Sequence, residues 1–311
     1  MPKTIPFYDL RVSSATERAV TQTLRSSWLT TGPAVERFEV GIKKLLDAPH
    51  AAAVSSATAG LTLALRAAGV GPGKQVITTP FSFVAGVEAI LNLGATPVFA
   101  DIAADTLNID PREVEKRLQK QTEAILAVDI AGYPCDYHAL RELARVNRVP
   151  LISDSAHALG ATLDGKSMPH WSDLAVYSFH ATKNLTCGEG GMVVARKRKL
   201  IDLIRLWSKH GMTASAYERK KSGGWAYDVG QSGYKANMSD ILASVGFCEL
   251  RSFDTYQEKR EKLAMRYVAN LSLVEGFLST PRLQAGFHHA WHLYIVRLNL
   301  DRLRISRNRF I

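Results

Sequence analysis

Residues 173–197, DLAVYSFHATKNLTCGEGGMVVARK, place one lysine between two short apolar runs. The runs at 174–179 and 191–195 are rich in residues that favour strands, so both predict buried strands. The connection between them holds Lys183 and ends in the glycine-rich stretch 188–191, which lets the backbone turn closely before the second strand. The pattern therefore predicts a strand, a loop that carries a lysine, and a second strand.

Lys183 follows His180 and Thr182 and precedes Asn184. A free lysine amine has a pKa of about 10.4, so it is protonated at neutral pH and cannot attack a carbonyl. In a partly desolvated pocket the amine loses its proton more readily and can form a Schiff base. A single loop lysine is more commonly a solvated surface residue, so the other motifs of the chain have to decide between these interpretations.

The composition of the 311 residues, 46% hydrophobic and 22% charged, is typical of a soluble globular protein with one large domain and a smaller second one. No apolar run reaches the ~18 residues of a membrane span, so we expect no membrane partner. The first ten residues lack the apolar core of a signal peptide, which favours a cytoplasmic protein.

Three widely spaced cysteines, Cys135, Cys187 and Cys248, form no C-x-x-C pair. They predict reduced thiols, with neither a disulfide framework nor a metal site. The net charge of +10 comes from Lys and Arg scattered among acidic residues along helical patterns. We interpret this charge as solvated surface with some attraction for an anionic, phosphorylated substrate, and we expect no nucleic-acid partner.

Short apolar strands alternate with helical patterns through the first two thirds of the chain. This alternation predicts a parallel α/β sheet covered by helices. Strands are predicted at 51–56, 75–79, 96–102, 124–130 and 150–153, with helices ending near 26 and at 35–46, 61–65, 83–93, 111–119 and 137–147. Ligands bind such sheets beyond the carboxyl ends of the strands, where we expect Ser56, Phe81, Asp129, Asp154 and His180.

The last third of the chain predicts helices at 200–210, 239–253 and 255–272 and an alternating strand at 291–298. Residues 212–236 have no clear period and predict a long functional loop. The final residues, 305–311, have the pattern of the opening of a helix.

The turn at 57–60 and Asp154 each permit more than one interpretation. Ala57 to Gly60 form a strand-to-helix turn of small residues, whose N–H groups could hold an anion, although ordinary capping by Ser and Thr also explains it. Asp154 ends a strand, where an acid could be a cap, a metal ligand or the partner of a pyridinium nitrogen. The last role fits beside Lys183, because a fixed carboxylate keeps the ring nitrogen of pyridoxal phosphate protonated.

The motifs SSATAG at 55–60, DSAH at 154–157, SFHATKN at 178–184 and GEGG at 188–191 occur in this order. The chain, from about Trp28 onward, resembles the pyridoxal-phosphate aminotransferases of the DegT/DnrJ/EryC1/StrS type, which act on keto sugars attached to nucleotides. GYKAN at 233–237 and HAWHLY at 289–294 are most similar to members that aminate UDP-linked 4-keto sugars for lipid A modification. A sequence with these motifs is expected to adopt the type I fold of pyridoxal-phosphate enzymes.

The resemblance implies a role for each matching residue. Lys183 is the implied Schiff-base lysine and proton shuttle, and Asp154 the implied partner of the pyridine nitrogen. The implied contacts of the cofactor phosphate are Ala57 through its N–H and Thr58 and Ser178 through their hydroxyls. Phe83 is implied to stack on the cofactor ring, and His157 to lie near the hydroxyl group of that ring. Asn237 is implied to contact the cofactor phosphate of the neighbouring subunit, on a loop that crosses the subunit boundary. Lys235 is implied either to belong to this loop or to contact the substrate phosphate.

The same resemblance implies a homodimer with shared active sites, glutamate and 2-oxoglutarate as the amino donor pair, and a large cofactor-binding domain at 1–238. It also implies that the small domain at 239–311 is incomplete, since members of the family continue further.

Two alternatives stay open. A sugar dehydratase of the same fold has His in place of the lysine, so Lys183 counts against it. A non-catalytic cofactor-binding remnant is the other alternative.

Overall fold

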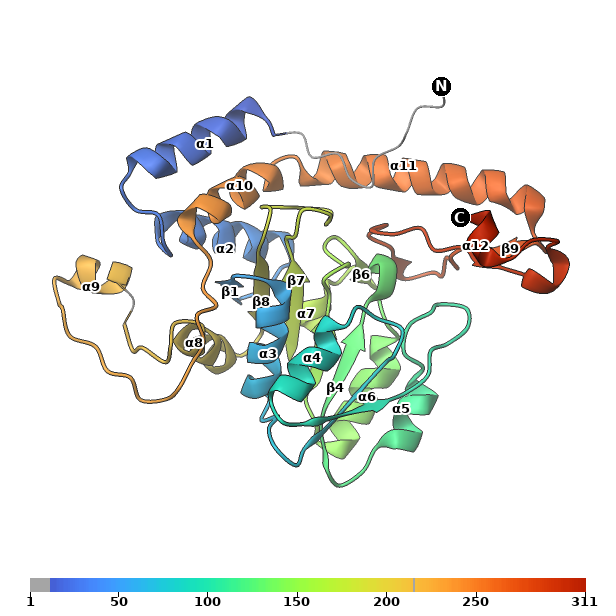
Figure 1. The fold of residues 1–311 in the computed structure, drawn as a ribbon, viewed down its shortest axis with the longest axis horizontal. Coiled ribbons are helices and arrows are strands. Elements are labelled where there is room, and N and C mark those ends of the chain that lie inside the picture. The colour runs from blue at the N-terminus through green and yellow to red at the C-terminus, as the bar shows by residue number, and fades with distance from the viewer. Residues whose placement is uncertain (1–11, 215) are drawn as a thin grey trace.

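The computed structural model describes residues 12–214 and 216–311, with a seven-stranded sheet at its centre (Figure 1). Its strands are, in spatial order, β1 (His50–Val54), β8 (Gly191–Ala195), β7 (Leu174–Ser178), β5 (Leu151–Asp154), β4 (Thr122–Val128), β2 (Gln75–Thr78) and β3 (Thr96–Phe99). β8 pairs antiparallel with β1 and β7, whereas the pairs from β7 across to β3 are parallel. The mostly parallel α/β sheet expected from the sequence is confirmed.

Helices cover both faces of this sheet because its central strands are apolar on both sides. In β4, Ala124 and Leu126 pack into one hydrophobic core, and Ile125 and Ala127 pack into the core on the other face. The first core lies under α3, α4 and α8, and the second under α2, α5, α6 and α10. These helices are α2 (Pro33–Leu45), α3 (Ala57–Ala67), α4 (Ala85–Asn92), α5 (Pro111–Arg117), α6 (Tyr137–Asn147), α8 (Arg198–Trp207) and α10 (Asp240–Leu250).

The sequence predicts a helix at each of these places, and most of the predicted ends differ from the observed ones by one to three residues, as is usual for helix termini. The first helix, α1 (Ser14–Arg25), packs against α10. Residues 1–11, which carry the prediction that no signal peptide is present, lie outside the described residues. Among the described residues, no helix is both long and apolar enough to cross a bilayer.

The strand predicted at 291–298 is wrong. Only β11 (Arg297–Leu298) is extended and paired there, with β9 (Leu278–Ser279). Trp291 has a φ of 52°, which a strand cannot contain, and its ring stacks on that of His289 with centroids 4.0 Å apart. The alternating apolar residues of this segment therefore do not form a pleated strand, and its aromatic rings pack against one another instead.

Residues 212–236 extend away from the sheet at the left of Figure 1. This segment is not irregular throughout as predicted, because α9 (Ala216–Ser222) forms within it. Beyond α9 the chain is open to solvent, and the side chain of Trp225 is 88% exposed.

After α10 the chain forms the long α11 (Phe253–Leu271) and ends in α12 (Arg307–Phe310), which confirms the helix predicted to open there. A short pair of strands, β6 (Thr162–Leu163) and β10 (Phe287–His288), ties this C-terminal part to the loop after β5. The division into domains at residue 238 stays a prediction.

Candidate active site

A pocket of about 590 Å³ opens beyond the carboxyl ends of β4, β5 and β7, beside the start of α3. Of the five residues expected at this edge, Ser56, Asp154 and His180 line it, whereas Asp129 is fully buried and Phe81 lies outside the lining. The predicted site residues that the structure brings together here are Ala57, Thr58, Phe83, Asp154, His157, Ser178 and Lys183.

The start of α3 forms one wall of the pocket. Ser56 is its N-cap, and the Ser56 side chain accepts a hydrogen bond from Ala59 N–H at 3.1 Å. Capping and anion binding, the two roles left open by the sequence, are compatible, since the cap leaves the N–H groups of Ala57 and Thr58 without intrahelical acceptors. These two N–H groups and the positive end of the helix dipole can hold a phosphate.

Gly191, the first residue of β8, makes this wall possible. A Cβ at Gly191 would lie 2.6 Å from the backbone nitrogen of Ala57 and 2.6 Å from the carbonyl carbon of Ser56. Both contacts are with backbone, so a side chain can be accommodated only by moving β8 away from the start of α3.

Gly191→Ala is therefore expected to weaken cofactor binding by about tenfold or more, because displacing the start of α3 misaligns its phosphate-binding N–H groups. Titration of the variant with pyridoxal phosphate, followed by absorbance, measures the dissociation constant. Gly71→Ala is the control, since a Cβ there meets no atom within 4 Å and Gly71 is not among the glycines with positive φ. Wild-type affinity in Gly191→Ala would show that this close approach does not matter for binding.

Lys183 lies in the connection between β7 and β8, where its N–H donates to the carbonyl of His180 at 2.9 Å. Its side chain is partly buried in the pocket, and burial lowers the pKa of the amine, while the charge of Asp154 opposes this shift. A lowered pKa raises the fraction of the neutral, nucleophilic amine at neutral pH.

Asp154, the last residue of β5, is 7% exposed. Burial raises the pKa of its carboxyl group to about 6, against the lowering effects of a hydrogen bond from Ala156 N–H and of the charge of Lys183. Ala156 N–H donates to Oδ1 at 3.1 Å. A cation at the other carboxylate oxygen would offset the cost of burying this charge.

A second buried carboxylate, Asp129, supports the strand end that carries Asp154. Its Oδ2 accepts hydrogen bonds from the hydroxyls of Ser153 and Ser155, both at 2.8 Å. Its Oδ1 accepts from Tyr137 Oη at 2.8 Å. Because Ser153 and Ser155 flank Asp154 in the chain, these bonds fix the backbone on both sides of it.

His157 and His292 form a pair of partly buried rings at the pocket, with centroids 4.3 Å apart. Burial is the main cause that lowers their pKa values, to about 3 for His157 and about 2 for His292, so both are neutral at pH 7. The N–H of Ala131 donates to His157 Nδ1 at 3.3 Å, which leaves the proton of the neutral ring on Nε2.

The sequence gives no role to His292, although it lies in the motif at 289–294. The structure brings His292 and Leu293 into the pocket, although they lie at least 102 positions beyond Gly190, the last of the other lining residues. Ser82, Thr182 and Glu189 also line the pocket without having been predicted as site residues. The cluster of three histidines at 288, 289 and 292 is a signal that could have indicated a functional segment.

Asn237 does not line this pocket. Its Nδ2 donates to Thr31 Oγ1 at 2.7 Å, and its Oδ1 accepts from Lys235 Nζ at 2.5 Å. Within one chain Asn237 therefore binds the loop before α2 and does not contact the residues around Lys183.

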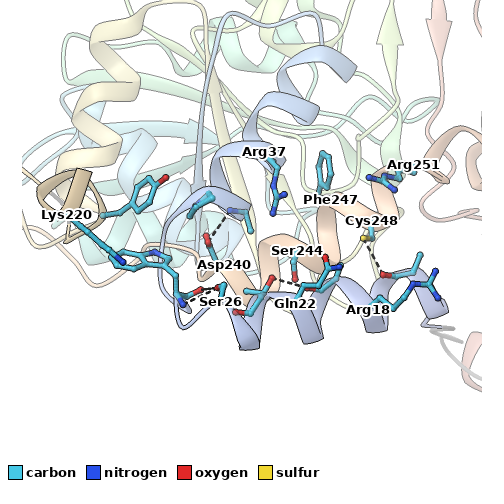
Figure 2. A pocket seen from close by; sticks show the side chains of 17 residues that line it. Arg18, Gln22, Ser26, Arg37, Lys220, Asp240, Ser244, Phe247, Cys248 and Arg251 are labelled. Carbon is cyan, nitrogen blue, oxygen red and sulfur yellow. Dashed lines mark hydrogen bonds between the residues drawn. The ribbon is translucent and has the colours of Figure 1, made fainter. Parts of the chain in front are cut away.

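A larger cleft of about 880 Å³ lies apart from the pocket, between α1, α2, α9 and α10. Figure 2 shows Arg37 and Arg251 beside Phe247, with Lys220 at the far end of the cleft. The carboxylate of Asp240 in its lining accepts hydrogen bonds from backbone N–H groups at the start of α2. None of the predicted site residues lines this cleft, so it is not the candidate active site.

The comparisons with known proteins agree with this geometry. The model of the DegT/DnrJ/EryC1/StrS aminotransferase family matches residues 11–311. The spore coat polysaccharide biosynthesis protein SpsC of Bacillus subtilis (strain 168) is 41% identical over 293 residues, which are 94% of this chain and 75% of SpsC.

Solved structures give the same result. The PLP form of Spr1654 from Streptococcus pneumoniae has a TM-score of 0.86 and 32% identity, covering 95% of this chain and 78% of Spr1654. PseC of Helicobacter pylori, an aminotransferase involved in the biosynthesis of pseudoaminic acid, has a TM-score of 0.88 and 29% identity, covering 96% and 79% of the two chains. The chain belongs to the DegT/DnrJ/EryC1/StrS aminotransferase family.

The protein is thus a pyridoxal-phosphate-dependent sugar aminotransferase with the type I fold, as expected from its motifs. The pocket fits the cofactor in three respects. The start of α3 offers free N–H groups for a phosphate, Asp154 is a buried carboxylate that a ring N–H can satisfy, and the amine of Lys183 has a lowered pKa.

Proposed function

We propose that this protein transfers an amino group from glutamate to a nucleotide-linked keto sugar, most specifically a UDP-linked 4-keto sugar. The observation that carries the proposal is the shared pocket of Lys183, Asp154 and the start of α3. These groups supply an amine, a carboxylate and an anion site, which are what amino transfer on pyridoxal phosphate needs.

Bound pyridoxal phosphate supplies an aldehyde carbon that accepts an amino group and a ring that withdraws electrons. Asp154 accepts a hydrogen bond from the ring nitrogen and keeps it protonated. The N–H groups of Ala57 and Thr58 and the hydroxyls of Thr58 and Ser178 hold the phosphate, and Phe83 packs on the ring face. Phe83 is 70% exposed in the single chain, which leaves its ring free to cover a ligand.

Lys183 moves the proton in each half-reaction. Its neutral amine would accept the proton from the carbon that bears the amino group of the donor and would deliver it to the carbon on the other side of that nitrogen, and a lowered pKa favours this role. His157 stays neutral and presents Nε2–H to the pocket, where it can donate to the ring hydroxyl of the cofactor.

The nucleotide-linked substrate is supported by the motif likeness at 233–237 and 289–294 and by the net charge of +10. SpsC acts in spore coat polysaccharide biosynthesis, and PseC in the synthesis of pseudoaminic acid. We infer that the product here is an amino sugar for a surface glycan, with lipopolysaccharide or lipid A as the expected acceptor, made in the cytoplasm.

The experiment is to incubate the cofactor-loaded protein with glutamate and a panel of nucleotide-linked 4-keto sugars, with detection of amine and 2-oxoglutarate by mass. We expect a shift of the visible cofactor band on adding glutamate alone, and one aminated sugar in the panel. A loss of water from the sugar without amine would indicate the dehydratase. A folded, yellow protein that never shifts with glutamate would indicate the non-catalytic remnant.

We further propose a homodimer in which Asn237 contacts the cofactor phosphate of the partner subunit. The support is the resemblance of the motif at 233–237, together with the place of Asn237, which bridges Val54 at the end of β1 and comes just before α10. A ligand that contacts both chains binds the assembled form and stabilises it by mass action.

Asn237→Ala is then expected to raise the cofactor dissociation constant by about tenfold, roughly the loss of one charge-assisted hydrogen bond. Sedimentation of the apo and holo forms should also show tighter dimers in the presence of cofactor. Thr31→Val is the matched control, because it removes the bond between Thr31 and Asn237 within one chain. An equal loss in Thr31→Val would mean that Asn237 acts only by holding the loop before α2.

A further inference from the structure

His292 lines the pocket of Lys183 but has none of the roles given above. Its ring is tilted by 38° to that of His157, and no hydrogen bond joins the two rings in the described part of the chain. Its backbone is fixed, since His292 N–H donates to the carbonyl of Ala131 at 3.0 Å. The ring is therefore held at the pocket, and what it offers there depends on which of its nitrogens carries the proton.

Asn184, the residue after Lys183, decides the position of this proton. Its Nδ2 lies 2.7 Å from the carbonyl oxygen of Ala290, and a backbone carbonyl can only accept, so Nδ2 is the donating end of the amide. The atom that lies 3.2 Å from His292 Nδ1 is then the amide oxygen, Oδ1. Because an amide oxygen can only accept, the proton of the neutral His292 ring is on Nδ1.

Gln257 holds the amide of Asn184 in this orientation. Asn184 Nδ2 also donates to Gln257 Oε1 at 3.2 Å, and Gln257 Nε2 donates to the carbonyl of Ala290 at 2.8 Å. Turning the Asn184 amide over would place its oxygen against two acceptors and break both of its hydrogen bonds. Asn184 is 9% exposed, so little water is present to replace them.

The other ring nitrogen of His292, Nε2, is consequently an acceptor without a partner. No described residue donates to it, and it is open to solvent, unlike the unpartnered polar atoms that are closed off inside the protein. Burial is the main cause that lowers the pKa of the ring to about 2, so Nε2 stays unprotonated at neutral pH. His157 is the opposite case, since its Nε2 carries the proton. The two neighbouring rings thus present one donor and one acceptor.

The molecules that enter the pocket differ in what they can donate to His292 Nε2. Pyridoxal phosphate offers a phosphate and a ring oxygen, which accept, and in the function proposed above its ring N–H pairs with Asp154. Glutamate offers two carboxylates, which also accept, and an amine that becomes attached to the cofactor carbon. A sugar, in contrast, carries neutral hydroxyls that donate. A sugar hydroxyl is therefore the donor that remains for this nitrogen.

We propose that His292 is a specificity-determining residue whose Nε2 accepts a hydrogen bond from a hydroxyl of the keto sugar, and that Asn184 is the positioning residue that keeps this nitrogen free to accept. The hydroxyl lies on a carbon next to the keto carbon, because Lys183 acts at the keto carbon and lines the same pocket. The inference rests on the proposed function and deepens it, since the preferred sugar has a hydroxyl at that position.

The two half-reactions test this role separately. The cofactor-loaded full chain is mixed with glutamate alone, and the shift of the visible band gives the first rate. The aminated form is then mixed with the accepted keto sugar, and the return of the band gives the second. In His292→Phe, which keeps a ring beside His157, we expect the sugar concentration for half-saturation to rise by about tenfold and the glutamate rate to stay within about twofold. His292→Gln should recover most of the sugar binding, because its side chain offers an oxygen acceptor.

His288→Phe is the matched control, because His288 belongs to the same segment and does not line the pocket. It should give wild-type values in both half-reactions. A pair of keto sugars that differ only in the hydroxyl next to the keto carbon gives a second comparison. The wild type should prefer the sugar with the hydroxyl by about tenfold, and His292→Phe should lose this preference.

Two-bond ¹H–¹⁵N NMR of protein with labelled histidines reads the protonated nitrogen directly and without turnover. We expect the proton of His292 on Nδ1, with the signals assigned by their loss in His292→Gln. Asn184→Leu removes the oxygen that fixes this proton, so the Nε2 signal should move toward the position of a protonated nitrogen. Sugar binding should weaken in the same variant, although His292 itself is unchanged.

A wild-type His292 with its proton on Nε2 would overturn the proposal, and so would unchanged sugar binding in His292→Phe. Equal slowing of both half-reactions would assign the acceptor to Lys183 instead of the sugar, with the same consequence. These results leave the proposed function intact. A wild type that reacts with glutamate but aminates no sugar would refute that function, and this inference with it. If His292→Phe does not fold by circular dichroism, the wild-type tautomer and the wild-type preference between the two sugars decide.

Discussion

Lys183→Ala is expected to lower the rate of amino transfer by more than about 10³-fold, because it removes both the covalent attachment to the cofactor and the group that moves the proton. The fold should be retained, since Lys183 lies in a loop and fills no hydrophobic core. The free energy of unfolding should therefore change by no more than about 1 kcal/mol. Turnover with glutamate and the accepted keto sugar measures the first effect, and thermal unfolding the second.

Lys197→Ala is the matched control for this variant. Lys197 has 76% of its side chain exposed and lies 3.9 Å from Asp173, at the opposite end of β7 from Lys183. Its replacement should leave both rate and stability near the wild-type values. Turnover by Lys183→Ala at a similar rate would show that another residue carries the chemistry.

Asp154→Asn is expected to bind the cofactor but to lose roughly 10²- to 10⁴-fold in rate. An amide cannot keep the ring nitrogen protonated, so the ring withdraws electrons less well, and the expected loss of rate corresponds to about 3–5 kcal/mol of transition-state stabilisation. Asp136→Asn is the control, because Asp136 is the N-cap of α6 and asparagine caps a helix equally well. An undiminished rate in Asp154→Asn would assign the protonation of the ring to another group.

The raised pKa of Asp154, about 6, also predicts the pH dependence of cofactor binding. Below pH 6 the carboxyl group of the free protein becomes protonated and can no longer accept the ring N–H, so the dissociation constant should rise as the pH falls through 6. Above this pH the carboxylate is ionised and binding is at full strength. Asp154→Asn has no group to titrate there, so its dissociation constant should lack this dependence.

Much of the candidate site follows from residues that are close in the sequence. Lys183 and Ser178 belong to one segment, and Asp154 and His157 to another, so each short motif carries its chemistry in the order of its residues. The parallel sheet then explains why they meet, since strands that run in one direction bring their carboxyl ends to one edge. The resemblance to the family supplied the role of Phe83, which no composition or spacing indicates. It also decided in favour of the anion-binding role that the turn at Ala57 and Thr58 had left open beside capping.

The segment at 289–294 shows where reasoning from the sequence fails. Alternation predicts a strand there, but a strand needs a neighbour for its backbone hydrogen bonds, and β11 finds one only at Arg297 and Leu298. His292 enters the pocket because its N–H and that of Leu293 donate to the carbonyl of Ala131. The contact joins two parts of the chain that no local pattern relates.

The sequence by itself thus determined the alternating α/β order, the parallel sheet, the lysine loop and the acid at the end of β5. These features depend on local propensity and on the period of apolar residues, both of which are visible in short windows. The tertiary structure alone decided how deeply Asp154 and Lys183 are buried, the pairing of His157 with His292, and the contact of His292 with Asn184. The physical reason is that burial, pKa shifts and cavities depend on segments far apart in the chain, whose packing sets the desolvation of each group.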